Sequence, residues 1–230
     1  MSVADDAVAK IRELIQTGRL RPGDRLPEEN TLADEFGISR NSMREAVRAL
    51  EQSGVLRVRH GSGTYVTSLE PALLLEGFAF AFNLLGGTRL PELLEVRQML
   101  EPLATRLAAE RMTDDKLESI RLSLEGHREQ TTIEELVEHD LAFHSAVIRA
   151  CGNETLATIL EGIAGETLRM RIWAAILDGN GVSKAHVEHG AIFSALEERN
   201  PRLAEAASLL HVTSSSRALQ AIIDAEEFPE

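Results

Sequence analysis

Apolar residues at the start of the chain follow the spacing of three short helices and then of a β-hairpin. Val8 and Ile11 begin one helical face, and two more segments of the same kind follow, each ended by a glycine. Pro27 suits the first turn of the second helix, and Ser39 or Asn41 can cap the third. A glycine-rich turn then separates two strand-forming runs. The pattern predicts helices over 5–18, 27–37 and 39–53 and strands over 55–59 and 64–67.

Three helices followed by a two-stranded ribbon form the outline of a winged helix-turn-helix, whose third helix enters the DNA major groove. Arg40, Arg44 and Arg48 are spaced by four, so they share a face opposite Met43 and Val47. Guanidinium groups bind phosphates, or the edge of guanine, in bidentate fashion. An ordinary solvated face has the same charge spacing, but the glycine-ended helices and the glycine-rich wing favour DNA binding.

The charge of the chain is unevenly distributed. The net charge of −13 over 230 residues argues against nucleic acid as a partner, yet residues 1–68 hold ten basic and ten acidic side chains. Residues 69–230 hold fourteen basic and twenty-seven acidic ones, which accounts for the whole excess. One cysteine, Cys151, excludes an internal disulfide, and neither a signal peptide nor a membrane span is visible. We therefore expect a cytoplasmic protein with two functions in one chain and no membrane partner.

Beyond a hinge at 68–71 the apolar periodicity predicts helices alone. The expected fold is mainly α, with an N-terminal winged helix-turn-helix and a C-terminal antiparallel α-helical bundle. The expected domains are a DNA-binding domain over 1–68, a linker over 69–75 and a metal- and effector-binding helical domain over 76–230. The predicted helices of the second part cover 72–85, 90–111, 114–128, 132–151, 154–177, 183–199 and 201–224.

Titratable residues interrupt the apolar stripes of three of these helices. Asp140 and His144 stand four apart on one stripe, and His189 and His211 lie on the stripes of two later helices. Burying such groups is costly unless they are paired, and a Zn, Ni, Mn or Fe ion could satisfy all four. Salt bridges and hydrogen-bonded core histidines explain the pattern equally well, so both interpretations stay open. Apolar positions expected to face inward beside them include Leu136, Val137, Leu141, Val147, Ile148, Ile192, Leu196, Leu203 and Leu210.

The N-terminal motifs resemble a known family. The runs RPGDRLPE at 21–28, GISRNSMREA at 37–46 and HGSGTYV at 60–66 resemble the DNA-binding domain of GntR-type bacterial transcriptional regulators, over nearly all of 8–67. Family members usually carry arginine where this chain has Asn30, so one phosphate contact is weakened or lost. The resemblance implies that the major groove is met by Ser39, Arg40, Asn41, Ser42 and Arg44 and that the minor groove is approached by His60 and Gly61.

A second set of motifs resembles the all-helical FCD effector domain of the FadR-type branch of the GntR regulators. The motifs are EVR at 95–97, DLAFH at 140–144, EHGAI at 188–192 and His211, and the resemblance spans roughly 75–220. Many members bind a divalent metal through one aspartate and three histidines. The resemblance thus implies a divalent cation, with zinc as the first choice and nickel, manganese or iron as alternatives. The implied ligands are Asp140, His144, His189 and His211.

Such a ligand set leaves coordination positions open, and in this branch a small organic acid commonly fills them. Arg97 fits the role of an effector-binding residue because it lies on the apolar stripe of its own helix. A buried guanidinium needs an anionic partner and binds carboxylates bidentately. Glu101, four residues further on, is the alternative partner.

These observations predict a metabolite-responsive transcriptional regulator, expected to be a repressor and not an enzyme. It would bind a palindromic double-stranded DNA operator as a homodimer, because a two-fold protein matches a two-fold site. One alternative is a metalloenzyme fused to a DNA-binding domain, in which the metal activates water. No recognisable general-base motif accompanies the candidate ligands. Another alternative is a helical domain used only for dimerisation, with Asp140 and the histidines as core salt bridges.

Overall fold

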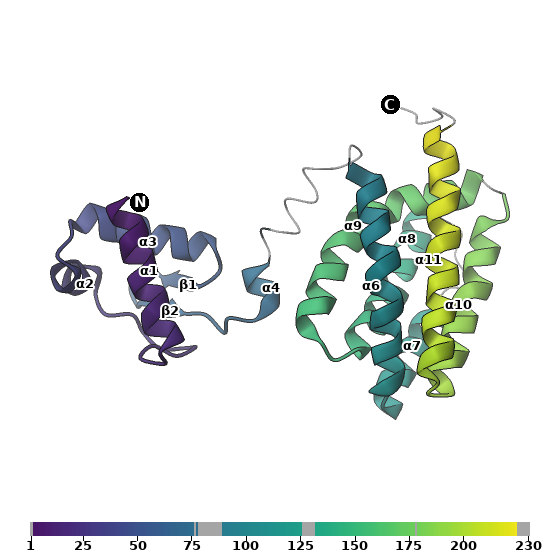
Figure 1. Ribbon diagram of the computed structural model, residues 1–230, viewed down its shortest axis with the longest axis horizontal. Helices are drawn as coiled ribbons and strands as arrows, with labels where there is room; N and C mark the ends of the chain where they lie inside the picture. Colours follow the sequence, from purple (N-terminus) through teal and green to yellow (C-terminus); the bar gives the residue numbers. More distant parts are fainter. Residues whose placement is uncertain (1, 76, 78–88, 126–131, 178, 225–230) are drawn as a thin grey trace. The chain divides into compact units, whose positions relative to one another are not determined.

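The chain divides into two units of different architecture, Met1–Gly77 and Phe78–Glu230 (Figure 1). The first contains a small antiparallel sheet, and the second is built from helices throughout its described residues. The expectation of a mainly α fold is confirmed. The computed structural model describes residues 2–75, 77, 89–125, 132–177 and 179–224.

The N-terminal unit is a winged helix-turn-helix, as predicted. Its strands pair antiparallel, with Leu56 opposite Val66 and Arg59 opposite Gly63. The second helix begins two residues after Pro27, so the expectation that this proline occupies its first turn is wrong. The elements are α1 (Val3–Gln16), α2 (Glu29–Phe36), α3 (Arg40–Gln52), β1 (Leu56–Arg59) and β2 (Gly63–Val66), followed by the short α4 (Pro71–Leu74).

The turn between α2 and α3 determines which face of α3 points outward. Gly37 ends α2 with a φ of 68°, in the left-handed region that glycine adopts without steric cost. Ser39 is the cap of α3, because its Oγ accepts a hydrogen bond from the backbone N–H of Ser42 at 3.1 Å. Met43 and Leu50 then lie in the core of the unit. As a result the arginine face of α3 is exposed.

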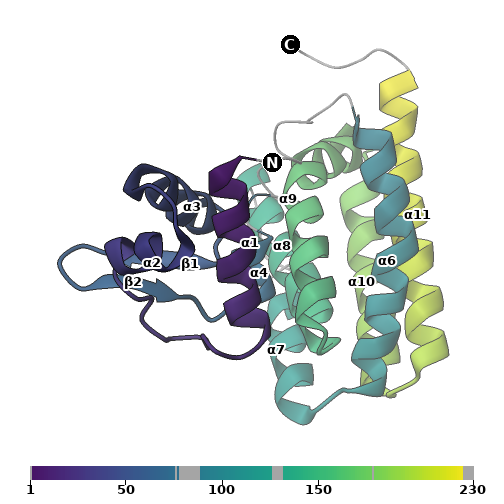
Figure 2. The same ribbon diagram turned by 60° about the vertical axis from the view of Figure 1, so that its left-hand side comes forward.

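The C-terminal unit is a bundle of long helices. Figures 1 and 2 both show α6 and α11 side by side, and α10 lies next to α11. The predicted helix over 72–85 lies mostly outside the described residues. None of the described helices is long and apolar enough to cross a membrane. The helices are α6 (Leu90–Glu110), α7 (Asp114–Glu125), α8 (Ile133–Ala150), α9 (Glu154–Leu177), α10 (Gly181–Glu197) and α11 (Pro201–Asp224).

The inward face of α11 differs from the expected one. Leu203 and Leu210 are 44% and 66% exposed, whereas Ser208 is buried and its Oγ lies 3.1 Å from the hydroxyl of Thr105 on α6. Small residues at this contact allow close approach of the two helices, and that approach sets the rotation of α11. On α8, Leu141 is also exposed, at 39%. The inward assignments of these three leucines were therefore wrong.

Candidate functional site

Three histidines from three helices converge in the interior of the C-terminal unit. The Nε2 atom of His211 on α11 lies 3.3 Å from the Nε2 atoms of both His144 on α8 and His189 on α10. The Oδ1 atom of Asp140 lies 3.6 Å from the Nε2 of His189 and 3.8 Å from that of His144. Each of the four residues is at most 7% exposed. The structure therefore brings all four sequence-predicted metal ligands together.

These spacings fit a bound cation. Metal–nitrogen bonds of about 2.1 Å at right or tetrahedral angles place neighbouring donor atoms roughly 3.0–3.4 Å apart. The two Nε2–Nε2 distances of 3.3 Å fall in this range. Histidine nitrogens and one carboxylate oxygen are donors that zinc and other first-row transition metals prefer. The arrangement can hold such an ion through Asp140, His144, His189 and His211.

The protonation states of these groups also suit a metal ligand set. Burial lowers the pKa of His144 to about 3, so its ring is neutral near neutral pH and keeps a lone pair for a cation. Burial raises the pKa of the Asp140 carboxyl, but the neighbouring His144 and Arg171 lower it further, and the net shift is downward. Asp140 is therefore an anionic ligand.

Two glutamates lie behind the histidines. Glu188 Oε2 lies 2.9 Å from the Nδ1 of His211, so an Nδ1–H donated to this carboxylate leaves the Nε2 lone pair directed at the centre. Glu101 Oε2 lies 3.9 Å from the Nδ1 of His144. The sequence analysis assigned no role to Glu188, although its position next to His189 was a signal. Such outer carboxylates orient metal-binding imidazoles and raise their basicity.

Arg97 is completely buried, and its partner is Glu101. Its Nε donates to Glu101 Oε1 at 2.5 Å, and its Nη1 donates to the hydroxyl of Thr167 at 3.3 Å. Burial raises the pKa of Glu101 while Arg97 lowers it, with a net value of about 2. Arg97 is absent from the wall of the cavity beside the centre. Its role as an effector-binding residue stays a prediction.

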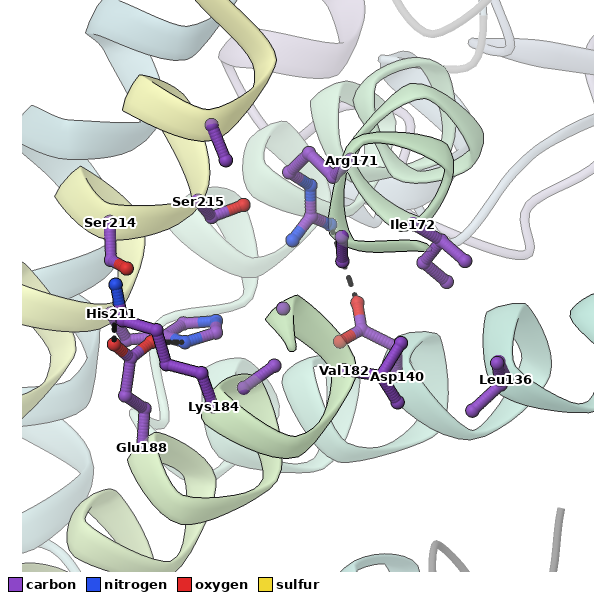
Figure 3. A pocket seen from close by; sticks show the side chains of 14 residues that line it. Leu136, Asp140, Arg171, Ile172, Val182, Lys184, Glu188, His211, Ser214 and Ser215 are labelled. Carbon is purple, nitrogen blue, oxygen red and sulfur yellow. Dashed lines mark hydrogen bonds and ion pairs between the residues drawn. The ribbon is translucent and has the colours of Figure 1, made fainter. Parts of the chain in front are cut away.

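A second buried arginine, Arg171 on α9, lies beside the centre and was missed by the sequence analysis. Its Nη2 lies 3.5 Å from Asp140 Oδ2, and it borders a cavity next to the histidines (Figure 3). Burial lowers the pKa of Arg171 to about 10, so the side chain keeps its charge at neutral pH. The available signal was its place just before the apolar run at 172–177.

The predicted DNA-binding residues lie on two exposed parts of the N-terminal unit. Arg40, Asn41 and Arg44 are exposed on the first turns of α3, next to the partly buried Ser42 and the capping Ser39. The nearest anionic group to Arg44 among its recorded ion pairs is 3.8 Å away, on α2. The turn that joins β1 and β2 exposes the other two residues, His60 and Gly61.

Comparisons with protein families agree with this architecture. Residues 3–66 match the model described as bacterial regulatory proteins, gntR family, and residues 92–214 match the FCD domain. The chain belongs to the GntR family. It is 35% identical to the HTH-type transcriptional regulator LutR of Bacillus subtilis, over 87% of this chain and 94% of LutR. It is 31% identical to the Exu regulon transcriptional regulator of Escherichia coli K12, over 90% of this chain and 80% of that one.

Further relatives extend over almost the whole chain. The galactonate operon transcriptional repressor of Escherichia coli K12 is 29% identical, over 96% of this chain and 99% of that protein. The solved structure of Streptococcus agalactiae GntR has 30% identity and a TM-score of 0.68, covering 94% of this chain and 99% of that one. This GntR-family protein is a DNA-binding transcriptional regulator. Its two domain types are regulatory, which confirms the prediction that it is not an enzyme.

Proposed function

We propose that this GntR-family regulator is a repressor that binds a divalent metal ion, with zinc as the first choice, and responds to a small organic acid. The convergence of three Nε2 atoms and one carboxylate oxygen in a buried site carries the proposal. Four protein ligands of this kind suit zinc and leave room for coordination to expand. Nickel, manganese and iron are the alternatives, because imidazole and carboxylate also suit them.

DNA binding would use the exposed start of α3 and the tip of the wing. Arg40 and Arg44 would bind phosphates or guanine edges, with Ser39, Asn41 and Ser42 at the same end of the helix. His60 and Gly61 would approach the minor groove. A homodimer on a palindromic operator follows from the match between two-fold protein and two-fold DNA. The name of one relative, a galactonate operon repressor, supports repression as the direction of control.

The organic acid would act by favouring one of two arrangements of the DNA-binding units. Its carboxylate would occupy an open coordination position of the metal, and Arg97 is the arginine predicted from sequence to assist. If the acid-bound arrangement misfits the operator, the protein dissociates from DNA. The size of that shift is limited by the difference in affinity of the acid for the two arrangements.

Elemental analysis of purified protein tests the metal site. We expect about one divalent ion per chain in the natural protein and loss of most of it in His189→Ala, since one ligand of four is removed. His139→Ala is the matched control, because His139 lies on α8 but is not among the four ligands. Operator binding by apo His189→Ala in a gel shift would report on the separate N-terminal core. Full metal occupancy in both His189→Ala and His211→Ala would refute the proposed ligand set.

A further inference from the structure

A cavity of about 80 Å³ lies next to the candidate metal centre and shares Asp140 and His211 with it. Side chains from α8, α9, α10 and α11 form its wall (Figure 3). The polar part of the wall also includes Arg171, Ser214 and Ser215. The apolar part consists of Leu136, Ile172, Ala175, Val182, Ala185 and Ala218.

Arg171 carries hydrogen-bonding capacity that the protein leaves unused. The residue is 5% exposed, and its one ion pair within the described chain is the 3.5 Å contact with Asp140. Its Nε–H has no hydrogen-bond partner among the described residues. In Figure 3 the guanidinium points from α9 toward Asp140, and the hydroxyl of Ser215 borders the same space. Because an unsatisfied buried donor costs free energy, an anionic acceptor in the cavity would be stabilised.

The charges around the site favour an anion once a metal is bound. The described side chains that form ion pairs here balance, with Asp140, Glu101 and Glu188 against Arg97, Arg171 and Lys184. The histidines add no charge while they are neutral. A divalent cation then adds two positive charges to a buried site, where uncompensated charge is expensive. A carboxylate ligand offsets part of this excess.

The volume limits the size of the ligand. A water molecule needs about 10–15 Å³ of such volume, so a cavity of about 80 Å³ holds roughly five to eight water-sized groups. A six-carbon sugar acid, with about thirteen non-hydrogen atoms, exceeds this limit. The apolar part of the wall also offers few partners for several hydroxyl groups, which would be buried without hydrogen bonds. Both features favour a short aliphatic acid.

Building on the metal-dependent sensing proposed above, we propose that the effector is a short aliphatic carboxylate of roughly five to eight non-hydrogen atoms. Its carboxylate lies between the metal ion and the guanidinium of Arg171, and its aliphatic end faces the apolar wall. Arg171 is the residue that selects the carboxylate. The small volume is the feature that rejects sugar acids such as the one for which the galactonate relative is named.

Titration calorimetry on the metal-loaded full-length protein tests this inference with glycolate, 2-hydroxybutyrate and D-galactonate as probes. We expect the two short acids to bind and galactonate not to bind. Arg171→Lys keeps the charge but loses the bidentate fork, so it should weaken binding of the short acids about 10- to 100-fold with the metal retained. Arg149→Lys, at an exposed arginine of α8, is the matched control and should bind as the natural protein does.

A second variant keeps the test sharp if Arg171→Lys folds poorly. Ala218→Leu narrows the cavity without changing its charge, so it should weaken binding of 2-hydroxybutyrate more than binding of glycolate. Galactonate binding as tight as that of the short acids would overturn the size limit. Unchanged acid binding by metal-loaded Arg171→Lys would overturn the role of Arg171. Absence of metal from the natural protein, read by elemental analysis before any acid is added, would refute the proposed function and this inference with it.

Discussion

Replacing Glu188 by glutamine probes how the protein prepares His211 for a cation. Glu188 Oε2 lies 2.9 Å from the Nδ1 of His211, and the glutamate side chain is only 12% exposed. Glutamine retains the shape and an acceptor oxygen but removes the negative charge, which makes the imidazole a weaker donor to the metal. Loss of such an outer partner typically lowers metal affinity 10- to 100-fold, or about 1.4–2.7 kcal/mol. We expect a loss in this range for Glu188→Gln.

Competition with a chromogenic chelator measures the metal dissociation constant of Glu188→Gln against that of the natural protein. Glu197→Gln is the matched control, because Glu197 is exposed near the end of the same helix, α10. The control should leave the constant unchanged. An unaltered constant in Glu188→Gln would refute the reasoning that its carboxylate supports His211. An equal loss in both variants would point to a general electrostatic effect instead.

Two further variants test the DNA-binding surface and the buried imidazole. Arg44→Ala should bind the operator more weakly and lower the slope of log affinity against log salt by about 0.9, as expected for one lost phosphate contact. Identical gel-shift affinities across a salt series would contradict that role. Because the pKa of His144 falls from 6.5 to about 3 on folding, the unfolded chain takes up a proton that the folded chain refuses as pH drops below 6.5. Thermal melting of metal-free protein should therefore show stability lost progressively between pH 6.5 and pH 3, with His144→Gln less pH-dependent than the natural protein. Parallel curves would show that this histidine is not buried in its neutral form.

The N-terminal unit was readily predicted because its signals are local. Glycines that end helices, a serine cap and the apolar spacing of α3 act within a few residues of one another. The exposed arginine face of α3 follows directly from the buried positions of Met43 and Leu50. Local rules were less exact at boundaries, since α2 begins after Pro27 rather than at it.

Helical periodicity was sufficient to direct the four candidate ligands inward, because each lies on an otherwise apolar stripe. It was insufficient to say which buried charges meet. Arg97 and Glu101 pair within one helix, whereas Arg171 reaches Asp140 on another helix and borders the cavity. The spacing of residues within a helix gives no information on the neighbour across an interface, so only the packed bundle distinguished the two arginines.

By itself the sequence determined the winged helix, the helical bundle and the identity of the inward-facing polar residues, because these depend on contacts between residues close in the chain. Tertiary structure alone decided the rotation of α11, which exposes Leu210 and buries Ser208 against α6. It also decided the placement of Glu188 behind His211 and of Arg171 beside Asp140. These features depend on how closely and at what rotation helices pack, which is set by side-chain volumes from several segments at once.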